Sequence, residues 1–172
     1  MTPPDLLTTT PCQTVGDLCG RFQAWHLPFI RSGKYYNALL NRHFPPLFDL
    51  PLQTLTKSVV LEWRAVIGQR HPQAANTALD LLRNLLNRGK EWDLYHGGDV
   101  TAGIKRFPEP SRGRFLYREE WERVKAVLDQ QPLLVRVYFN LLIYEGPRMS
   151  EARLMQWSHL DLREGLWRKP LT

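Results

Sequence analysis

Arg148 is the residue of this chain whose type and position best suit chemistry. It lies in the segment Glu145–Leu162, which reads EGPRMSEARLMQWSHLDL. Because glycine often ends a helix and proline often begins one, Gly146–Pro147 predicts a helix start that puts Arg148 in the first turn. The free amide groups and the dipole of a first turn favour an anion. A guanidinium there adds planar donors that match phosphate oxygens, so the segment is suited to bind a phosphodiester and to stabilise charge developing on it.

An ordinary surface role is the alternative for Arg148. An arginine in a first turn can simply pair with an acidic neighbour such as Glu151. Exposed ion pairs of this kind are common and weak, so position alone favours the surface role. The surrounding elements and the rest of the chain are therefore needed to distinguish phosphate binding from a surface ion pair.

The residues before Arg148 predict two helices of a second folded unit. The first, Tyr117–Leu128, is amphipathic. Pro132 can begin the second, Leu133–Tyr144, which is apolar almost all round and is therefore expected to be buried.

The residues after Arg148 predict the end of its helix and the beginning of a sheet. The helix is expected to run to about Trp157. A turn follows at Glu164–Gly165, and Leu166–Trp167 is typical of the start of a strand. Because the sequence ends at Thr172, when the sheet has only begun, we expect the second unit to be incomplete.

Before residue 100, the sequence predicts four helices and no convincing strand, which indicates a small all-α domain. Apolar residues recur at helical spacing in each segment. The segments are Val15–Arg31 with an end or kink at Pro28, Ser32–Phe44, a third from an N-cap at Thr56 through Ile67, and Gln73–Arg88. Gly68 and Gly89 fit the C-terminal ends of the last two.

Residues 104–115 are predicted to form a basic linker, because two prolines, a glycine and four basic residues stand between periodic segments. The plainer alternative is a solvated connector. The whole chain has 23 basic and 17 acidic residues and a formal net charge of +6. Residues 1–106 and residues 107–172 are both positive, so an extended anion such as DNA could contact both parts.

Eleven residues are candidates for contacts to DNA. They lie at the start of the predicted second helix, just before the fourth helix, on its expected polar side, or in and beside the linker. The candidates are Lys34, Tyr35, Arg70, His71, Asn76, Thr77, Arg83, Lys105, Arg106, Arg112 and Arg114. Each one singly is more often solvated than functional, because every surface helix has a polar face. Their combination with the basic linker is what favours DNA.

The sequence argues against secretion, membrane insertion and metal binding. Its 172 residues, 43% of them hydrophobic, suffice for a folded core. The first ten residues have neither the basic start nor the apolar stretch of a signal peptide, and the longest apolar run is too short to span a bilayer. Cys12 and Cys19 match no zinc pattern, and the histidines show no ligand spacing. We therefore expect a soluble intracellular protein with no metal site.

The stretch from Phe115 to Trp167 resembles the start of the catalytic domain of the tyrosine recombinases, the phage integrase family. The matching features are RFLYREEWERVKAVL, the apolar helix, EGPRMSEARLMQWSHLDL and the turn into a strand. In that family, the helix after the turn carries the first catalytic arginine, followed by Ser or Gly and Glu and by a downstream Trp and Asp. The resemblance places these residues at Arg148, Ser150, Glu151, Trp157 and Asp161.

The resemblance implies a mainly α fold with two domains. A four-helix SAM-like core-binding domain, a small helical clamp on DNA, is expected over residues 11–106. A basic linker over residues 107–114 and the incomplete, mostly helical start of the catalytic domain over residues 115–172 are expected to follow.

The resemblance also implies that the intact protein recombines or integrates double-stranded DNA of a mobile element at specific sites. In the family, a tyrosine attacks a phosphodiester and forms a covalent 3′-phosphotyrosyl link, and Arg148 would hold the phosphate during this step. The family needs no cofactor or metal. Intact relatives act as tetramers, whereas this chain is expected to be a monomer in the bacterial or phage-infected cytoplasm, associated with the nucleoid.

Two departures from the family pattern limit what this chain is expected to do. Tyr117 stands where the family has a capping Thr or Ser. The later catalytic groups, including the tyrosine nucleophile, are expected beyond Thr172, and Lys169 lies too early to be the favoured hairpin lysine. The chain alone is therefore expected to bind DNA without cutting it. A non-catalytic DNA-binding regulator or a helical interaction protein derived from an integrase is the alternative.

Overall fold

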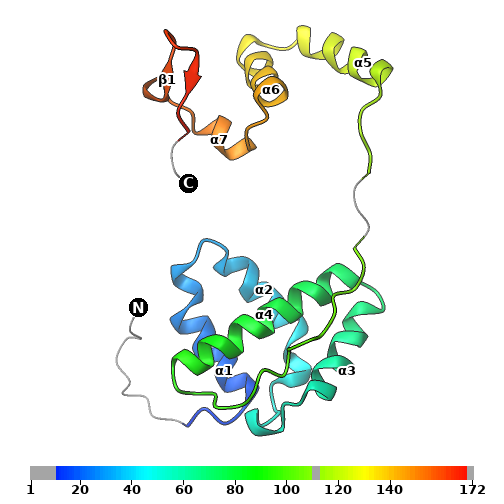
Figure 1. Ribbon diagram of the computed structural model, residues 1–172, viewed down its shortest axis with the longest axis vertical. Helices are drawn as coiled ribbons and strands as arrows, with labels where there is room; N and C mark the ends of the chain where they lie inside the picture. The colour runs from blue at the N-terminus through cyan, green and yellow to red at the C-terminus, as the bar shows by residue number, and fades with distance from the viewer. Residues whose placement is uncertain (1–10, 110–112, 170–172) are drawn as a thin grey trace. The chain divides into compact units, whose positions relative to one another are not determined.

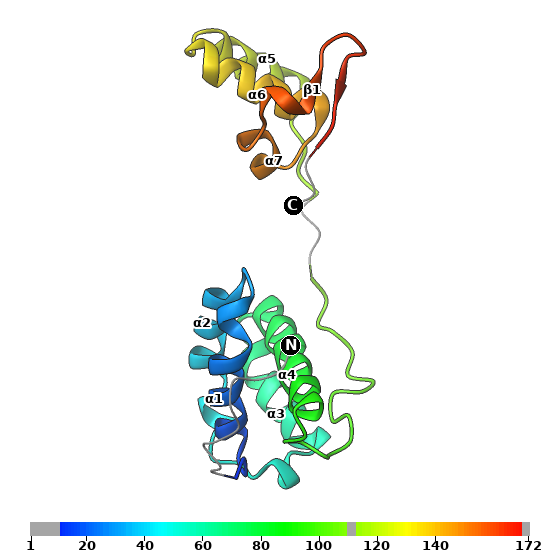
Figure 2. The same cartoon turned by 90° about the vertical axis from the view of Figure 1, so that its left-hand side faces the viewer.

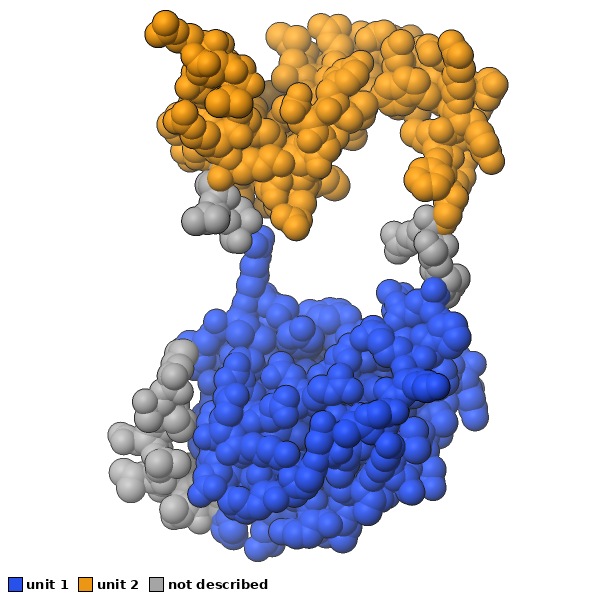
Figure 3. All heavy atoms as spheres, in the orientation of Figure 1, with its two compact units in different colours: residues 1–111 blue, residues 112–172 orange. Residues whose placement is uncertain are grey.

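The computed structural model describes residues 11–109 and 113–169. The chain divides into two compact units, residues 1–111 and residues 112–172, which Figure 3 shows in different colours. Helices dominate both units, which confirms the predicted mainly α fold. Within the described residues, no helix combines the length and the hydropathy needed to cross a lipid bilayer.

The first unit is a helical domain built around its longest helix, α4 (Figures 1 and 2). Its α-helices within the described residues are α1 Val15–Trp25, α2 Gly33–His43, α3 Lys57–Gly68 and α4 Pro72–Glu91. Three short 3-10 helices, Leu27–Phe29, Pro45–Leu47 and Leu52–Thr54, connect them. Helix α4 packs against α1, α2 and α3, and its apolar side chains form the centre of one continuous core. Phe22, Leu40, Phe44, Leu82 and Leu85 are fully buried there.

Polar side chains begin two of these helices. The Thr56 hydroxyl accepts a hydrogen bond from the Val59 amide at 3.4 Å, which confirms Thr56 as the N-cap of α3. At α1, the Thr14 hydroxyl accepts from the Asp17 amide at 3.1 Å and the Asp17 carboxylate accepts from the Thr14 amide at 2.9 Å. This reciprocal pair satisfies amide groups that the helix itself leaves free.

One predicted helix end in the first unit, that of α4, is wrong. The helix from Val15 ends at Trp25, just before Pro28, the residue that was expected to end or kink it and that lies in a separate 3-10 helix. Gly89 does not close α4, which continues to Glu91. Gly89 is buried inside the helix, and its carbonyl accepts from the Leu94 and Tyr95 amides at 2.8 and 3.1 Å. The glycine therefore allows the returning chain to approach the helix closely rather than ending it.

After α4 the chain turns and runs back along the same helix, antiparallel to it. Thr101 contacts Arg83, and Phe107 contacts Asn76, two turns nearer the start of α4. We call residues 99–109 the strap. The Phe107 ring lies against Gly68, where a Cβ atom would overlap the ring, so any side chain at the end of α3 would have to displace it.

The second unit has three α-helices and one small hairpin among its described residues. They are α5 Arg118–Asp129, α6 Leu133–Glu145, α7 Met149–Arg153, a 3-10 helix Trp157–His159, and the strands β1 Leu160–Asp161 and β2 Leu166–Trp167. The strands pair antiparallel, with Leu160 opposite Trp167 and Asp161 opposite Leu166. The predicted turn and strand are confirmed, as is the helix end at Gly146, whose φ of 59° is left-handed.

The expectation that the apolar helix of the second unit is buried is wrong. In the described part of the chain, no residue of α6 is buried, and Leu134 is 80% exposed. Leu128, Pro147 and Ala152 are the buried apolar residues described in this unit. An all-round apolar helix needs covering elements on every side, and α5, α7 and a hairpin of two-residue strands are too few to supply them.

Candidate functional site

Arg148 lies at the N-cap of α7, one position before the helix rather than in its first turn. Helix α7 has only five residues and ends at Arg153, so the predicted extension to Trp157 is also wrong. The Arg148 backbone is extended, with φ −65° and ψ 145°. Its side chain is 82% exposed. Because a single short turn has a small dipole, the guanidinium itself must supply most of any attraction for an anion.

Glu151 holds Arg148 in place through two hydrogen bonds. Its side chain is only 9% exposed, and one oxygen accepts from the Arg148 amide at 3.0 Å while the other accepts from Arg148 Nη1 at 2.9 Å. Hydrogen bonds from the backbone and then the side chain of Arg148 hold the pKa of Glu151 below its usual value, and the charge of Lys169 acts in the same direction. The ion pair between Arg148 and Glu151 that the surface alternative predicts is therefore present. The pair nevertheless leaves most of the Arg148 side chain in solvent.

Lys169 joins the same carboxylate from the end of the hairpin. Its ammonium lies 3.5 Å from Glu151 Oε2 and 5.2 Å from the centre of the Trp167 ring. The hairpin thus brings a second cation to Glu151, so that Arg148, Lys169 and Glu151 together carry a net positive charge. Two cations on one shared carboxylate leave donors that a phosphate could bind. Sequence spacing alone put Lys169 near the hairpin without showing its approach to Glu151.

Four of the predicted DNA-contacting residues, those that precede α4, are exposed. Lys34 and Tyr35 lie at the start of α2, and Tyr35 is 56% exposed. Arg70 and His71 lie in the short connection between α3 and α4. All four are accessible to a partner, as a contact to DNA requires.

Asn76 was expected on the polar surface of α4, but it lies in the interior. It is 0% exposed. Its Oδ1 accepts from Arg64 Nη2 at 3.1 Å and from the Phe107 amide at 2.8 Å, and its Nδ2 donates to the Phe107 carbonyl at 3.0 Å and to Glu109 Oε1 at 2.6 Å. The strap covers this side of α4, so Asn76 has no free group for DNA. Its neighbour Thr77 is half-buried and donates its hydroxyl to the Gln73 carbonyl at 3.0 Å.

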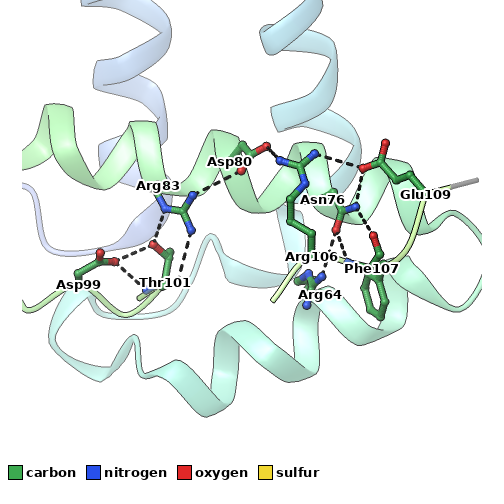
Figure 4. Close-up of polar contacts among 9 residues, drawn as sticks. All are labelled: Arg64, Asn76, Asp80, Arg83, Asp99, Thr101, Arg106, Phe107 and Glu109. Atoms are coloured by element: carbon green, nitrogen blue, oxygen red, sulfur yellow. Dashed lines mark hydrogen bonds and ion pairs between the residues drawn. The ribbon is translucent and has the colours of Figure 1, made fainter. Parts of the chain in front are cut away.

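Arg106 is exposed and Arg83 is half-buried, and both are already paired, as Figure 4 shows. Arg83 Nε donates to the Thr101 hydroxyl at 3.1 Å, and Nη1 lies 3.5 Å from Asp80. Arg106 contacts Asp80 at 2.6 Å and Glu109 at 3.2 Å. The Asp80–Arg83 and Arg106–Glu109 pairs join residues three apart in the sequence, whereas the Asp80–Arg106 pair depends on the strap lying against α4.

The remaining basic candidates lie around the expected linker. Lys105 is exposed. Arg114 is exposed and pairs with Glu120 at 2.6 Å. Arg112 lies outside the described residues. Phe107 and Glu109, which were expected in the linker, both contact α4.

Arg64 is a buried cation that the sequence reasoning missed. It is 5% exposed, its guanidinium carbon lies 3.9 Å from the centre of the Phe107 ring, and its Nε has no hydrogen-bond partner within the described ranges. Burial lowers the pKa of Arg64, and the charge of Arg106 adds to this effect. Its helical spacing from the inward-facing Val60 and Ile67 was the signal that could have revealed a charge on the apolar side of α3.

No protein-family model matches the sequence, and no solved structure matches it at a significant level. A curated relative, the Shufflon-specific DNA recombinase of Escherichia coli, is 30% identical over 105 residues. The match covers 59% of this chain and 27% of the relative. The chain is therefore similar to a DNA recombinase over more than half of its own length, and it spans about a quarter of the length of that protein.

Proposed function

We propose that this chain binds double-stranded DNA and belongs to a site-specific tyrosine recombinase in which Arg148 holds the phosphate to be cut. The observation that carries the proposal is that the Arg148 side chain is 82% exposed although the buried Glu151 accepts hydrogen bonds from its Nη1 and from the Arg148 backbone amide. A held but accessible fork of donors suits a phosphodiester. The similarity to a DNA recombinase supports the choice of DNA as the source of that phosphate.

In the proposed enzyme, Arg148 stabilises the negative charge that builds on the phosphate as a tyrosine attacks it. Lys169 reaches the same carboxylate and adds positive charge beside the site. Two tyrosines already have structural hydrogen bonds: the Tyr95 hydroxyl donates to the Gly98 carbonyl at 2.9 Å, and the Tyr138 hydroxyl donates to the Met149 carbonyl at 3.1 Å. We infer that the intact enzyme supplies the nucleophile from another position, and that this chain by itself binds DNA without cutting it.

DNA binding is tested with a labelled duplex and the wild-type chain over a range of salt concentrations. We expect log K to fall with log salt by about 0.9 for each phosphate contact. The Arg148→Ala variant should lose about one such contact. Arg153→Ala is the matched control, because Arg153 is an exposed arginine at the other end of the same short helix. Binding with no salt dependence, or equal losses in the two variants, would contradict the proposal.

Cutting is tested separately by denaturing the mixture and looking for protein attached to labelled DNA. This chain should give no covalent adduct. An intact enzyme that contains it should give one, and its Arg148→Ala form should give none while keeping the circular-dichroism spectrum of the unchanged protein. An adduct with this chain alone would refute the inference that the nucleophile lies elsewhere. Normal cutting by the intact Arg148→Ala enzyme would refute the catalytic role.

A further inference from the structure

Carboxylates lie beside two of the arginines that were expected to contact DNA, Arg83 of α4 and Arg106 of the strap. Arg83 lies 3.5 Å from Asp80 and also donates to Thr101 of the strap. Arg106, itself in the strap, is held between Asp80 at 2.6 Å and Glu109 at 3.2 Å (Figure 4). Asp80 therefore links both arginines, one through each of its oxygens.

Glu109 is the carboxylate of this group that also bonds to a buried side chain. Its Oε1 accepts from the buried Asn76 at 2.6 Å as well as from Arg106. The hydrogen bonds from Asn76 and then Arg106 hold the pKa of Glu109 below its usual value, so it is charged at neutral pH. The same carboxylates raise the pKa of Arg106.

The contacts of the strap fall into an inner and an outer set. The inner set is buried or half-buried: the Phe107 backbone bonds to Asn76 and its ring covers Arg64. The outer set is open to water, because the Arg106 side chain is 56% exposed and that of Asp80 is 43% exposed. Exposed ion pairs contribute little to stability, whereas a phosphate can accept two parallel hydrogen bonds from one guanidinium. The outer contacts can therefore exchange partners while the inner ones keep the strap in place.

We propose that the outer contacts are an electrostatic cover, in which Asp80 and Glu109 occupy Arg83 and Arg106 and must be displaced by the phosphates of DNA. The inference rests on the proposed DNA binding and adds a restraint to it. The cover lowers the affinity of the chain for any polyanion that cannot displace both carboxylates. It also weakens non-specific binding of small anions to this surface.

The test uses three forms of the chain and one labelled duplex. The first is the wild type, and the second is Asp80→Asn with Glu109→Gln, which keeps the side-chain shapes but removes both charges. The third is Asp49→Asn with Glu62→Gln, which changes the net charge equally at two exposed acids that have no ion pair among the described residues. Circular-dichroism melting verifies that all three are folded.

Removing the cover should tighten binding between about three- and tenfold relative to the third form, which is the range expected for freeing weak exposed ion pairs. The salt dependence should steepen by about 0.9 for each arginine that gains a phosphate. A further change, Arg106→Gln, should weaken binding by the uncovered form several-fold more than binding by the wild type, because only the uncovered form uses that arginine fully.

The outcomes separate the cover from DNA binding itself. If the wild type binds with a salt dependence but the second and third forms gain affinity equally, net charge explains the gain and the cover is refuted while the proposed function stands. If Arg106→Gln has the same effect in both backgrounds, the cover is likewise refuted. If no form binds the duplex, both proposals fail.

Discussion

Replacing Asn76 with alanine removes the side chain that joins the strap to α3 and α4. The Asn76 side chain makes four hydrogen bonds, and it is fully buried. In the variant, Arg64 Nη2 and both backbone groups of Phe107 lose these partners, while Glu109 can turn to water. The change therefore leaves polar groups without partners in a part of the molecule that water does not reach freely.

The expected cost follows from those groups. A buried polar group left without a partner costs about 1–3 kcal/mol, and the lower figure for each of the three groups gives a loss of about 3 kcal/mol in the free energy of unfolding. A domain of this size loses roughly 4–8 °C in melting temperature for each kcal/mol, so the transition of the first unit should move down by roughly 12–24 °C.

Urea unfolding followed by circular dichroism measures the loss. Asn87→Ala is the matched control, because Asn87 is exposed on the same helix and should change stability by no more than about 0.5 kcal/mol. Proteolysis of the folded variant should also cut the strap faster than in the wild type. A loss below about 1 kcal/mol, with the strap still protected, would show that Asn76 does not hold the strap and would refute the reasoning.

Three further predictions concern single residues. Thr14→Ala should cost about 1 kcal/mol in urea unfolding, because it removes the N-cap of α1, and an equal stability of Thr14→Ala and wild type would contradict the capping role. Burial raises the pKa of Cys19 to about 12, so mass spectrometry should find it unmodified by iodoacetamide at neutral pH in the folded chain; Cys12, whose pKa burial also raises, should react slowly, and rapid labelling of Cys19 would contradict its burial. The pKa of Glu151 is lowered in the folded chain, so the stability from its contacts is present above the usual value of 4.5 and is lost as the pH falls through the lowered folded value. Acid titration of the second unit by circular dichroism should therefore show a transition that Glu151→Gln flattens, and identical titrations would contradict this prediction.

The sequence predicted the elements whose signals are local. Thr56 begins α3, and Gly146 ends α6, because an N-cap hydroxyl and a left-handed glycine act on their own helix. Gly89 carries the same kind of signal, but the chain that returns beside it overrides it.

The faces of the helices were harder to predict, because each depends on what covers it. The spacing of Asn76 on α4 indicated a polar surface, and only the distant strap makes that surface an interior. The opposite happened at α6, where apolar residues indicated burial and no described element covers Leu134. Periodicity gives the direction of a side chain relative to its own helix but not what lies opposite it.

In the candidate site, too, contacts between neighbouring residues could be predicted and contacts between distant ones could not. The motif around Arg148 pointed to the arginine and to Glu151, because both lie within one turn of chain. The approach of Lys169 depends on the path of a hairpin, and the pairing of Arg106 with Asp80 depends on a segment that folds back over α4. These contacts join residues far apart in the sequence, which no spacing rule encodes.

The glycine at the end of α3 has a consequence for how the first unit could change during evolution. Gly68 leaves the space that the Phe107 ring fills, and that ring in turn shields the Arg64 guanidinium. A side chain at residue 68 would lift the ring and let water reach a cation that now has few partners. The absence of a side chain at residue 68 thus lets the strap lie against α3 and keeps a charge beneath it shielded from water.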